Sequence, residues 1–141
     1  MALLSYGICR IDFYKNNIDF FTGTGENPVH YLIGDDSGNS AVIEFIDNEV
    51  KVIRDNNPWQ VATNFIINDI NIPDQVTCPR YKKAYQTLQE CHGELDQQIA
   101  MDLLKDVSIY GTTWSCLYDL TNRSVSVAIN RNYKNIYSFS L

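Results

Sequence analysis

Turn-forming residues divide positions 29–53 into short runs that are rich in β-branched and aromatic residues. The dividing segments are Gly34-Asp-Asp-Ser-Gly-Asn39 and Asp47-Asn48, and the runs between them are Val29–Ile33, Ala41–Ile46 and Glu49–Ile53. Runs of this length, bounded by Gly, Asn and Asp, are typical of β-strands joined by tight turns. The region therefore predicts an antiparallel meander, and Gln60–Phe65 is a candidate for a further strand.

Two helices are predicted downstream of this meander. After Pro79, apolar residues recur with helical spacing at Tyr81, Ala84, Tyr85, Leu88 and Cys91. Proline suits the first turn of a helix, where its missing N–H would be unpaired anyway, and Gly93 is a natural stop. A second helix is predicted to begin near Asp96, because Ile99, Ala100, Leu103, Leu104 and Val107 fall on one face.

The remaining sequence returns to a β pattern. Thr113–Asp119 and Ser124–Ile129 flank a short polar turn as a β-hairpin does, and Ile136–Leu141 alternates as a last strand would. Residues 1–28 show no readable period. Strands, then helices, then strands without an internal linker predict a single α+β domain over residues 1–141.

Composition excludes several classes of partner. The chain of 141 residues carries 11 Lys and Arg against 17 Asp and Glu, a net charge of −6, which argues against nucleic-acid binding. Its apolar runs are far shorter than the roughly 18 residues of a membrane-spanning helix. The first residues lack the basic and apolar regions of a secretory signal. We therefore expect a cytoplasmic protein with neither a nucleic acid nor a membrane as partner.

The residues that could hold a metal or cofactor form no recognisable pattern. No pair of cysteines has Cys-x-x-Cys spacing, and the adjacent Cys91 and His92 would point in different directions in a helix or strand. Asp35-Asp36 precedes Ser-Gly-Asn, which indicates turn chemistry rather than a cation site. Phosphate-binding and zinc-protease motifs do not occur. We expect no metal and no cofactor, and we interpret Cys78 and Cys91 as packing residues.

Four segments carry a resemblance to a known family. They are His30–Phe45, Val61-Ala-Thr-Asn-Phe65, Cys78-Pro-Arg-Tyr-Lys-Lys-Ala-Tyr85 and Trp114–Leu141. In order and spacing they resemble the C-terminal half of the choloylglycine hydrolase family. That family of linear amide C–N hydrolases includes bile salt hydrolases and penicillin V acylases, and it is related to the acyl-coenzyme A:6-aminopenicillanic acid acyltransferases. The resemblance covers residues 29–141.

The resemblance implies a fold and a chemistry. Members are N-terminal nucleophile (Ntn) hydrolases with an αββα sandwich, so this chain would form half of such a sandwich. Their nucleophile is a cysteine exposed as the first residue, whose thiol attacks an N-acyl amide while its own α-amine acts as the base. By resemblance, Asn64 corresponds to the asparagine that helps hold the oxyanion, and Arg80 to the arginine beside the nucleophile.

The sequence also departs from the family. It begins Met1-Ala2-Leu3 rather than with a cysteine after Met, and Phe65-Ile66 replaces the Ser-Pro that follows Thr-Asn in bile salt hydrolases. Cys9 is a poor candidate nucleophile, because Arg10-Ile-Asp-Phe-Tyr14 does not resemble the family's first strand. We therefore expect the chain to lack the nucleophile and to be inactive alone, with an N-acyl amide as substrate only of the complete enzyme.

Three hypotheses follow from this departure. The chain is one part of a split or processed enzyme, completed by a polypeptide that supplies the N-terminal half. Alternatively it is a truncated product that self-associates through faces left bare. In the third hypothesis it is a stand-alone, non-catalytic binding or interaction module that reuses the half-fold as a homodimer.

Overall fold

The computed structural model describes residues 6–11, 29–35, 37–46, 49–54, 56–63, 65–68 and 76–141. Within these residues the elements are, in order, β1 (Tyr6–Ile11), β2 (Val29–Gly34), β3 (Ser40–Ile46), β4 (Glu49–Ile53), α1 (Pro79–Glu90), α2 (Gln97–Asp106), β5 (Trp114–Asp119), β6 (Ser124–Ile129) and β7 (Ile136–Ser140). The α+β class predicted from the sequence is therefore confirmed.

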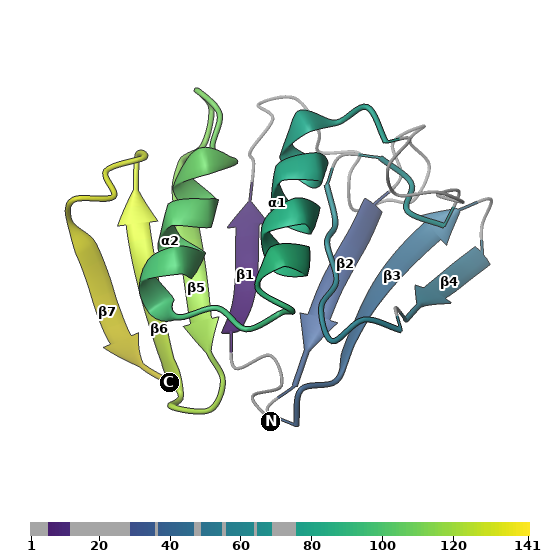
Figure 1. The fold of residues 1–141 in the computed structure, drawn as a ribbon, viewed down its shortest axis with the longest axis horizontal. Helices are drawn as coiled ribbons and strands as arrows, with labels where there is room; N and C mark the ends of the chain where they lie inside the picture. Colours follow the sequence, from purple (N-terminus) through teal and green to yellow (C-terminus); the bar gives the residue numbers. More distant parts are fainter. Residues whose placement is uncertain are drawn as a thin grey trace.

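The strands form two antiparallel sheets. One has four strands in the order β1-β5-β6-β7, and the other has three in the order β2-β3-β4. Figure 1 shows the two sheets side by side, with β1 of the first next to β2 of the second. The meander over β2, β3 and β4 and the β5–β6 hairpin match the sequence prediction.

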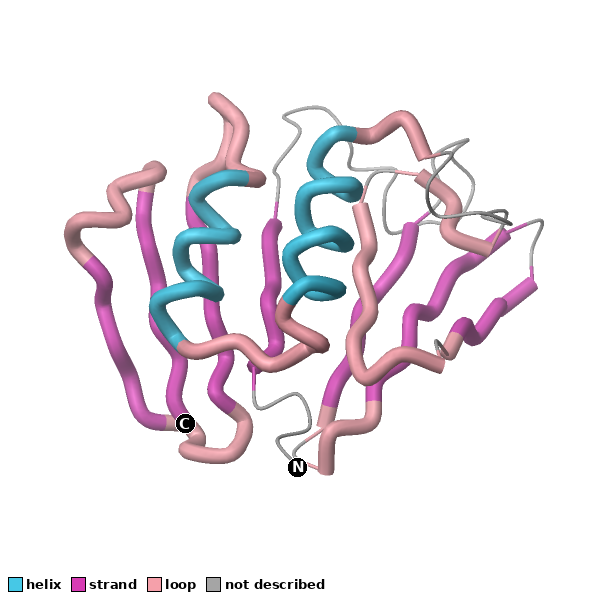
Figure 2. Tube along the Cα trace, in the orientation of Figure 1, coloured by secondary structure: helices cyan, strands magenta, loops and turns pink. Residues whose placement is uncertain are grey.

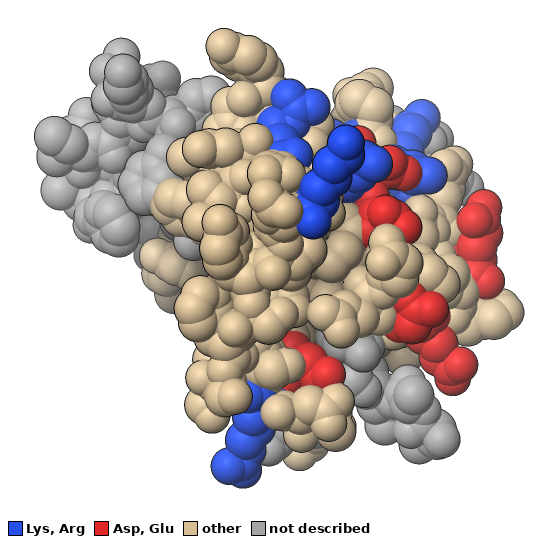
Figure 3. Space-filling view, turned by 90° about the vertical axis from the view of Figure 1, so that its left-hand side faces the viewer, with Lys and Arg blue, Asp and Glu red and all other residues tan. Residues whose placement is uncertain are grey.

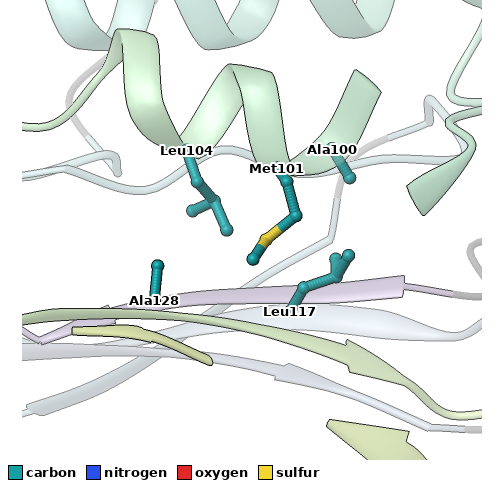
Figure 4. Close-up of a cluster of buried hydrophobic side chains, with 5 residues drawn as sticks. All are labelled: Ala100, Met101, Leu104, Leu117 and Ala128. Atoms are coloured by element: carbon teal, nitrogen blue, oxygen red, sulfur yellow. The ribbon is translucent and has the colours of Figure 1, made fainter. Parts of the chain in front are cut away.

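Both helices lie on the same side of the sheets (Figure 1). Helix α2 packs on the four-stranded sheet and also contacts α1. The core beneath α2 joins its apolar face to β5 and β6 and consists of Ala100, Met101, Leu104, Leu117 and Ala128. Figure 4 shows the three α2 side chains directed toward Leu117 and Ala128. Burial of these side chains is what fixes α2 on the sheet.

Helix α1 ends where the sequence predicts. The His92 N–H donates to the Gln89 carbonyl at 3.1 Å, and the Gly93 N–H donates to the Leu88 carbonyl at 2.8 Å. This pair of bonds is a Schellman motif, which satisfies carbonyls that the helix end leaves without partners. Gly93 has a φ of +78°, and a Cβ there would lie 2.9 Å from Cε3 of Trp59. Glycine is therefore required at position 93 by both backbone conformation and space.

Helix α2 begins with a side-chain cap. The Asp96 carboxylate accepts the Ile99 N–H at 2.7 Å, and Lys105 lies in the last turn. An aspartate at the N-cap and a lysine near the C-terminus both favour the helix electrostatically. The start predicted near Asp96 is confirmed.

Two sequence predictions differ from the structure. Residues 1–28 gave no readable pattern, yet Tyr6–Ile11 forms β1 at the edge of the four-stranded sheet. In contrast, the predicted strand over Gln60–Phe65 is wrong, because residues 60–63 and 65 form no strand. This segment follows α1 instead of pairing with a sheet: Trp59 meets Gly93 just beyond the end of α1, and Thr63 bonds Cys78 at its start. Figure 2 shows this loop alongside α1.

The side of the sheets away from the helices is apolar. In β3, Val42 and Glu44 are 1% and 0% exposed, and in β5 Leu117 is 2% exposed. On the opposite face, large apolar side chains are 46–58% exposed, and they are Tyr31, Ile33, Phe45, Val50, Val52, Ile129, Tyr137 and Phe139. We call this set the open sheet face. It extends over both sheets.

Charged side chains gather on the helix side of the molecule in the view of Figure 3. Figure 3 views the molecule from the β7 edge, so that the helices of Figure 1 come to the right. Acidic and basic groups gather in that half, whereas uncharged surface predominates on the left among the coloured residues. None of the helices that the structure describes is long and apolar enough to cross a membrane.

Candidate functional site

The candidate site lies where the segment over residues 56–68 meets β3 and the start of α1. Its first component is Glu44, a fully buried carboxylate on β3. One oxygen of Glu44 accepts the Ile67 N–H at 2.7 Å, and the other accepts the Asn68 N–H at 2.9 Å. A buried carboxylate is costly unless it is hydrogen-bonded, and here each oxygen has a backbone donor. Glu44 therefore anchors residues 67 and 68 to the sheet.

A further hydrogen bond to β3 holds the same segment nearer its beginning. The Gln60 side-chain amide donates to the Ser40 hydroxyl at 3.0 Å, which links the segment to the first residue of β3. The Phe65 N–H donates to the Thr63 carbonyl at 2.9 Å. Side chains of β3 thus bond the segment at residue 60 and at residues 67 and 68.

Thr63 lies against the N-terminus of α1. The Thr63 hydroxyl donates to the Cys78 thiol at an Oγ1–Sγ distance of 3.7 Å. Cys78 is the N-cap residue of α1, in an extended conformation, and Pro79 follows as the first helical residue. Residues far apart in the sequence, one before Asn64 and one before Pro79, are thereby brought into contact.

The environment of Cys78 favours its thiolate. Partial burial raises the pKa of the Cys78 thiol, but several other groups lower it. These are the Tyr81 amide, the Thr63 hydroxyl, and the amide and positive charge of Arg80, and the net result is a pKa below the ordinary value of 9.0. Backbone amides at a helix start and a nearby guanidinium stabilise a thiolate. Cys78 is therefore more than the packing residue that the sequence suggested.

Arg80, a predicted site residue, is the second residue of α1 and is half-buried. A cation is electrostatically disfavoured in the first turn of a helix, but Arg80 lies close enough to Cys78 to act on its thiol. Asn64, the other predicted site residue, lies outside the described residues. Its flanking residues Thr63 and Phe65 are described, and both contact the α1 region.

Three aromatic rings pack together where residue 65 meets α1. The Phe65 ring meets the Tyr81 ring edge-on with centroids 5.3 Å apart, and Tyr81 stacks on Tyr85 at 5.9 Å. Tyr81 is 5% exposed. Edge-on and stacked pairs at these separations are favourable beyond the area they bury. They hold the residue after Asn64 against the first two turns of α1.

Sequence reasoning missed Glu44, Thr63 and Cys78 as parts of a site. In the sequence, Glu44 is an ordinary polar residue within a predicted strand, and its burial becomes evident only in the folded structure. The signal for Cys78 was its position next to Pro79, which marks a helix start. Asp35 behaves as predicted, since its carboxylate accepts the Ser37 and Asn39 amides of a turn, at 3.0 and 2.9 Å. Asp36 lies outside the described residues.

Within the described part of the chain, no three His, Cys, Asp or Glu side chains are grouped so that they could hold a metal ion. Comparison with known proteins gives no further identification. No protein-family model matches the sequence, and neither a curated protein nor a solved structure matches the chain.

Proposed function

We propose that this chain is the C-terminal half of a cysteine Ntn hydrolase that cleaves linear N-acyl amide bonds, and that another polypeptide segment supplies the nucleophile. The observation that carries the proposal is the open sheet face. Both helices lie on one side of the sheets, and on the other side eight large apolar side chains are 46–58% exposed. Sheets with helices on one side and exposed apolar side chains on the other are what one half of an αββα sandwich requires, namely one α layer and one β layer.

The physical reason is the cost of leaving such a face in water. Large apolar side chains that gather in the solvent on one face mark interaction surfaces in soluble proteins. Two sheets that pack face to face lie about 10 Å apart and interdigitate the side chains of their inner faces. A second sheet laid on Tyr31, Phe45, Tyr137 and Phe139 would remove them from water, and it would be the third layer of the sandwich.

The candidate site supports the same proposal. The resemblance assigns roles to Asn64 and Arg80, which belong to separate segments of the sequence. The Thr63–Cys78 contact brings those two segments together at 3.7 Å. An amide that binds an oxyanion and a guanidinium that favours a thiolate have to act at one reaction centre. Adjacency of the two segments is what such a centre requires.

In the proposed reaction this chain has a supporting role. A thiolate from the N-terminal half attacks the amide carbonyl, and the tetrahedral oxyanion is bound in part by the Asn64 side-chain amide. Arg80 stabilises the attacking thiolate. All four cysteines of this sequence lie inside the chain, so none of them carries the free α-amine that acts as the base in the proposed reaction.

Reconstitution tests the proposal. The DNA upstream of Met1 is sequenced, and the product of a reading frame that begins Met-Cys is co-expressed with this chain. Amine release from a glycine-conjugated bile salt and from a phenoxyacetyl amide is then followed with fluorescamine. We expect the pair to hydrolyse at least one of them, each half alone to be inactive, and Asn64→Ala and Arg80→Ala to lower turnover sharply while the pair still forms.

Two outcomes would count against the proposal. Turnover that is unchanged by both substitutions would remove Asn64 and Arg80 from the site. An unrelated upstream gene, together with a monodisperse homodimer of this chain, would favour a stand-alone binding module instead.

A further inference from the structure

We propose that the outer edge of β7 pairs with the same edge of a second copy of this chain, so that two four-stranded sheets join into one continuous sheet. Strand β7 ends its sheet and, among the described strands, pairs only with β6. Figure 1 shows it as the outermost strand, beyond the side of α2. This edge is distinct from the open sheet face, and its pairing is independent of the proposed function.

The hydrogen bonds between β6 and β7 show which backbone groups point to the outer edge. The Leu141 N–H donates to the Arg123 carbonyl at 2.7 Å, and these two residues continue the β6–β7 register. Hydrogen-bonded and non-hydrogen-bonded pairs alternate along an antiparallel ladder. The odd-numbered residues of β7 therefore bond β6, whereas the N–H and C=O groups of Ser138 and Ser140 point away from it. These outward groups are a template for a further strand.

Strand β7 lacks the features that protect other sheet edges. Proteins block exposed edges with charged side chains, proline or a β-bulge. The sequence of β7, Ile-Tyr-Ser-Phe-Ser, has no charged residue and no proline, and its register with β6 runs without a break. In contrast, β4 at the edge of the three-stranded sheet carries Glu49 and Lys51 among its five residues. This difference distinguishes β7 as the edge that is open to pairing.

A second copy of β7 is the occupant that this edge fits, because the strand is complementary to itself. In an antiparallel pair centred on Ser138, that residue lies opposite Ser138 of the second copy, and Ile136 lies opposite the copy's Ser140. These even-numbered residues are the ones whose backbone groups point outward. Each such opposed pair can therefore exchange two hydrogen bonds.

The same register pairs the aromatic side chains of β7. Tyr137 and Phe139 are 51% and 57% exposed in the single chain. In the paired strands Tyr137 lies opposite Phe139 of the second copy, in a non-hydrogen-bonded position where side chains come closest. Aromatic pairs directly opposite one another on a sheet face are favourable. Each copy contributes both residues, so the aromatic contact is made twice.

The symmetry of this pairing limits the assembly to two copies. The two-fold axis is perpendicular to the sheet, so the helices of both copies lie on one side and their open sheet faces become continuous on the other. The edge of β7 is used up in each copy, which makes the contact isologous and closed. Five opposed residue pairs bury less than the roughly 1,600 Å² of a standard interface. We therefore expect a dimer that forms as the protein concentration rises.

Variants at position 138 test the backbone pairing. Ser138→Pro removes the outward N–H at the centre of the pair, and proline is tolerated on an edge strand where the N–H faces solvent. Ser138→Ala is the matched control: both variants lose the contact of the Ser138 hydroxyl with the Ser126 hydroxyl at 3.3 Å, but alanine keeps the N–H. Sedimentation velocity measures the mass over a range of protein concentrations, and circular dichroism establishes folding.

Two charged variants test the register even if Ser138→Pro folds poorly. Ser138 is exposed, so Ser138→Lys and Ser138→Glu each add a charge at the surface. Across the two-fold axis, either variant alone places like charges directly opposite one another, which is destabilising. A mixture of the two variants places opposite charges there. We expect each variant alone to be monomeric and the mixture to form a dimer.

For the wild type and Ser138→Ala, we expect the mass to rise from one chain toward two chains with concentration, while Ser138→Pro stays at one chain. Hydrogen exchange at the Ser138 and Ser140 amides of the wild type should slow as the dimer forms. A wild-type chain that stays monomeric throughout would overturn the inference. A dimer that forms equally well in Ser138→Pro and in Ser138→Lys alone would also overturn it, because another surface would then hold the copies together.

Discussion

The two sheets are covered on their helix side in different ways. The four-stranded sheet is covered by α2, whose Ala100, Met101 and Leu104 pack on Leu117 and Ala128. On the helix side of the three-stranded sheet, an irregular segment is held by the buried carboxylate of Glu44. The first arrangement is set by apolar area and the second by hydrogen bonds. This difference suggests that the first sheet mainly supplies stability, while the second positions the candidate site.

The largest expected effect on the free energy of unfolding comes from the apolar core beneath α2. Leu104 is 1% exposed in the α2 core, so Leu104→Ala removes buried methyl groups and leaves a cavity. We expect a loss of about 2–5 kcal/mol in the free energy of unfolding, measured by urea denaturation. Leu141→Ala, at a position that is 64% exposed, is the matched control and should cost far less. Equal costs would mean that the α2 core does not dominate stability.

Glu44→Ala tests the hydrogen bonds that hold residues 67 and 68 on the three-stranded sheet. It leaves the Ile67 and Asn68 amides without their acceptors, and we expect a loss of about 1–3 kcal/mol. Hydrogen exchange at these two amides should accelerate more than exchange in α2. Glu44→Gln retains one side-chain oxygen acceptor, so its free energy of unfolding should lie between those of Glu44→Ala and the wild type. If hydrogen exchange in α2 accelerates as much as exchange at residues 67 and 68, the Glu44 hydrogen bonds do not act on this segment alone, which would contradict the prediction.

Local sequence signals mark most of the helices and strands, but not the contacts between distant segments. Strand and helix positions were predictable because turn residues, Pro79, Gly93 and Asp96 act on their immediate neighbours. Strand β1 was not, because its partner β5 lies about a hundred residues away and its own residues show no period. Residues 60–63 have a strand-like composition but run along α1, which no local pattern indicates. The burial of Glu44 likewise depends on the folded segment above it.

The candidate site gives a smaller, local effect. Since the pKa of Cys78 lies below 9.0, its alkylation by iodoacetamide should reach half its maximal rate below that pH. Arg80→Ala removes a positive charge and Thr63→Val removes a hydroxyl donor, so each should shift the midpoint to higher pH. Cys91, at the far end of α1, is the internal control and should respond to neither substitution. An unchanged Cys78 midpoint in both variants would mean that neither group acts on the thiol.

The smallest effect is expected at the β2–β3 turn. Hydrogen bonds from the Asn39 side chain and amide are the main cause that lowers the pKa of Asp35 below 3.8. A carboxylate whose pKa is lowered by folding contributes stability above its ordinary pKa and loses that contribution as the pH falls through the lowered value. The stability difference between the wild type and Asp35→Asn should therefore shrink below about pH 4. A difference that is constant from neutral to acidic pH would contradict the assignment.

In the proposed function, the open sheet face receives a second sheet from another polypeptide. The most direct measurement is co-purification of the chain with the Met-Cys-initiated upstream product, using Phe139→Lys on the open sheet face and Gln86→Lys on the exposed surface of α1 as a matched pair. Circular dichroism establishes that both variants are folded. We expect Phe139→Lys to abolish the complex and Gln86→Lys to leave it intact. Equal binding by the two variants would contradict it.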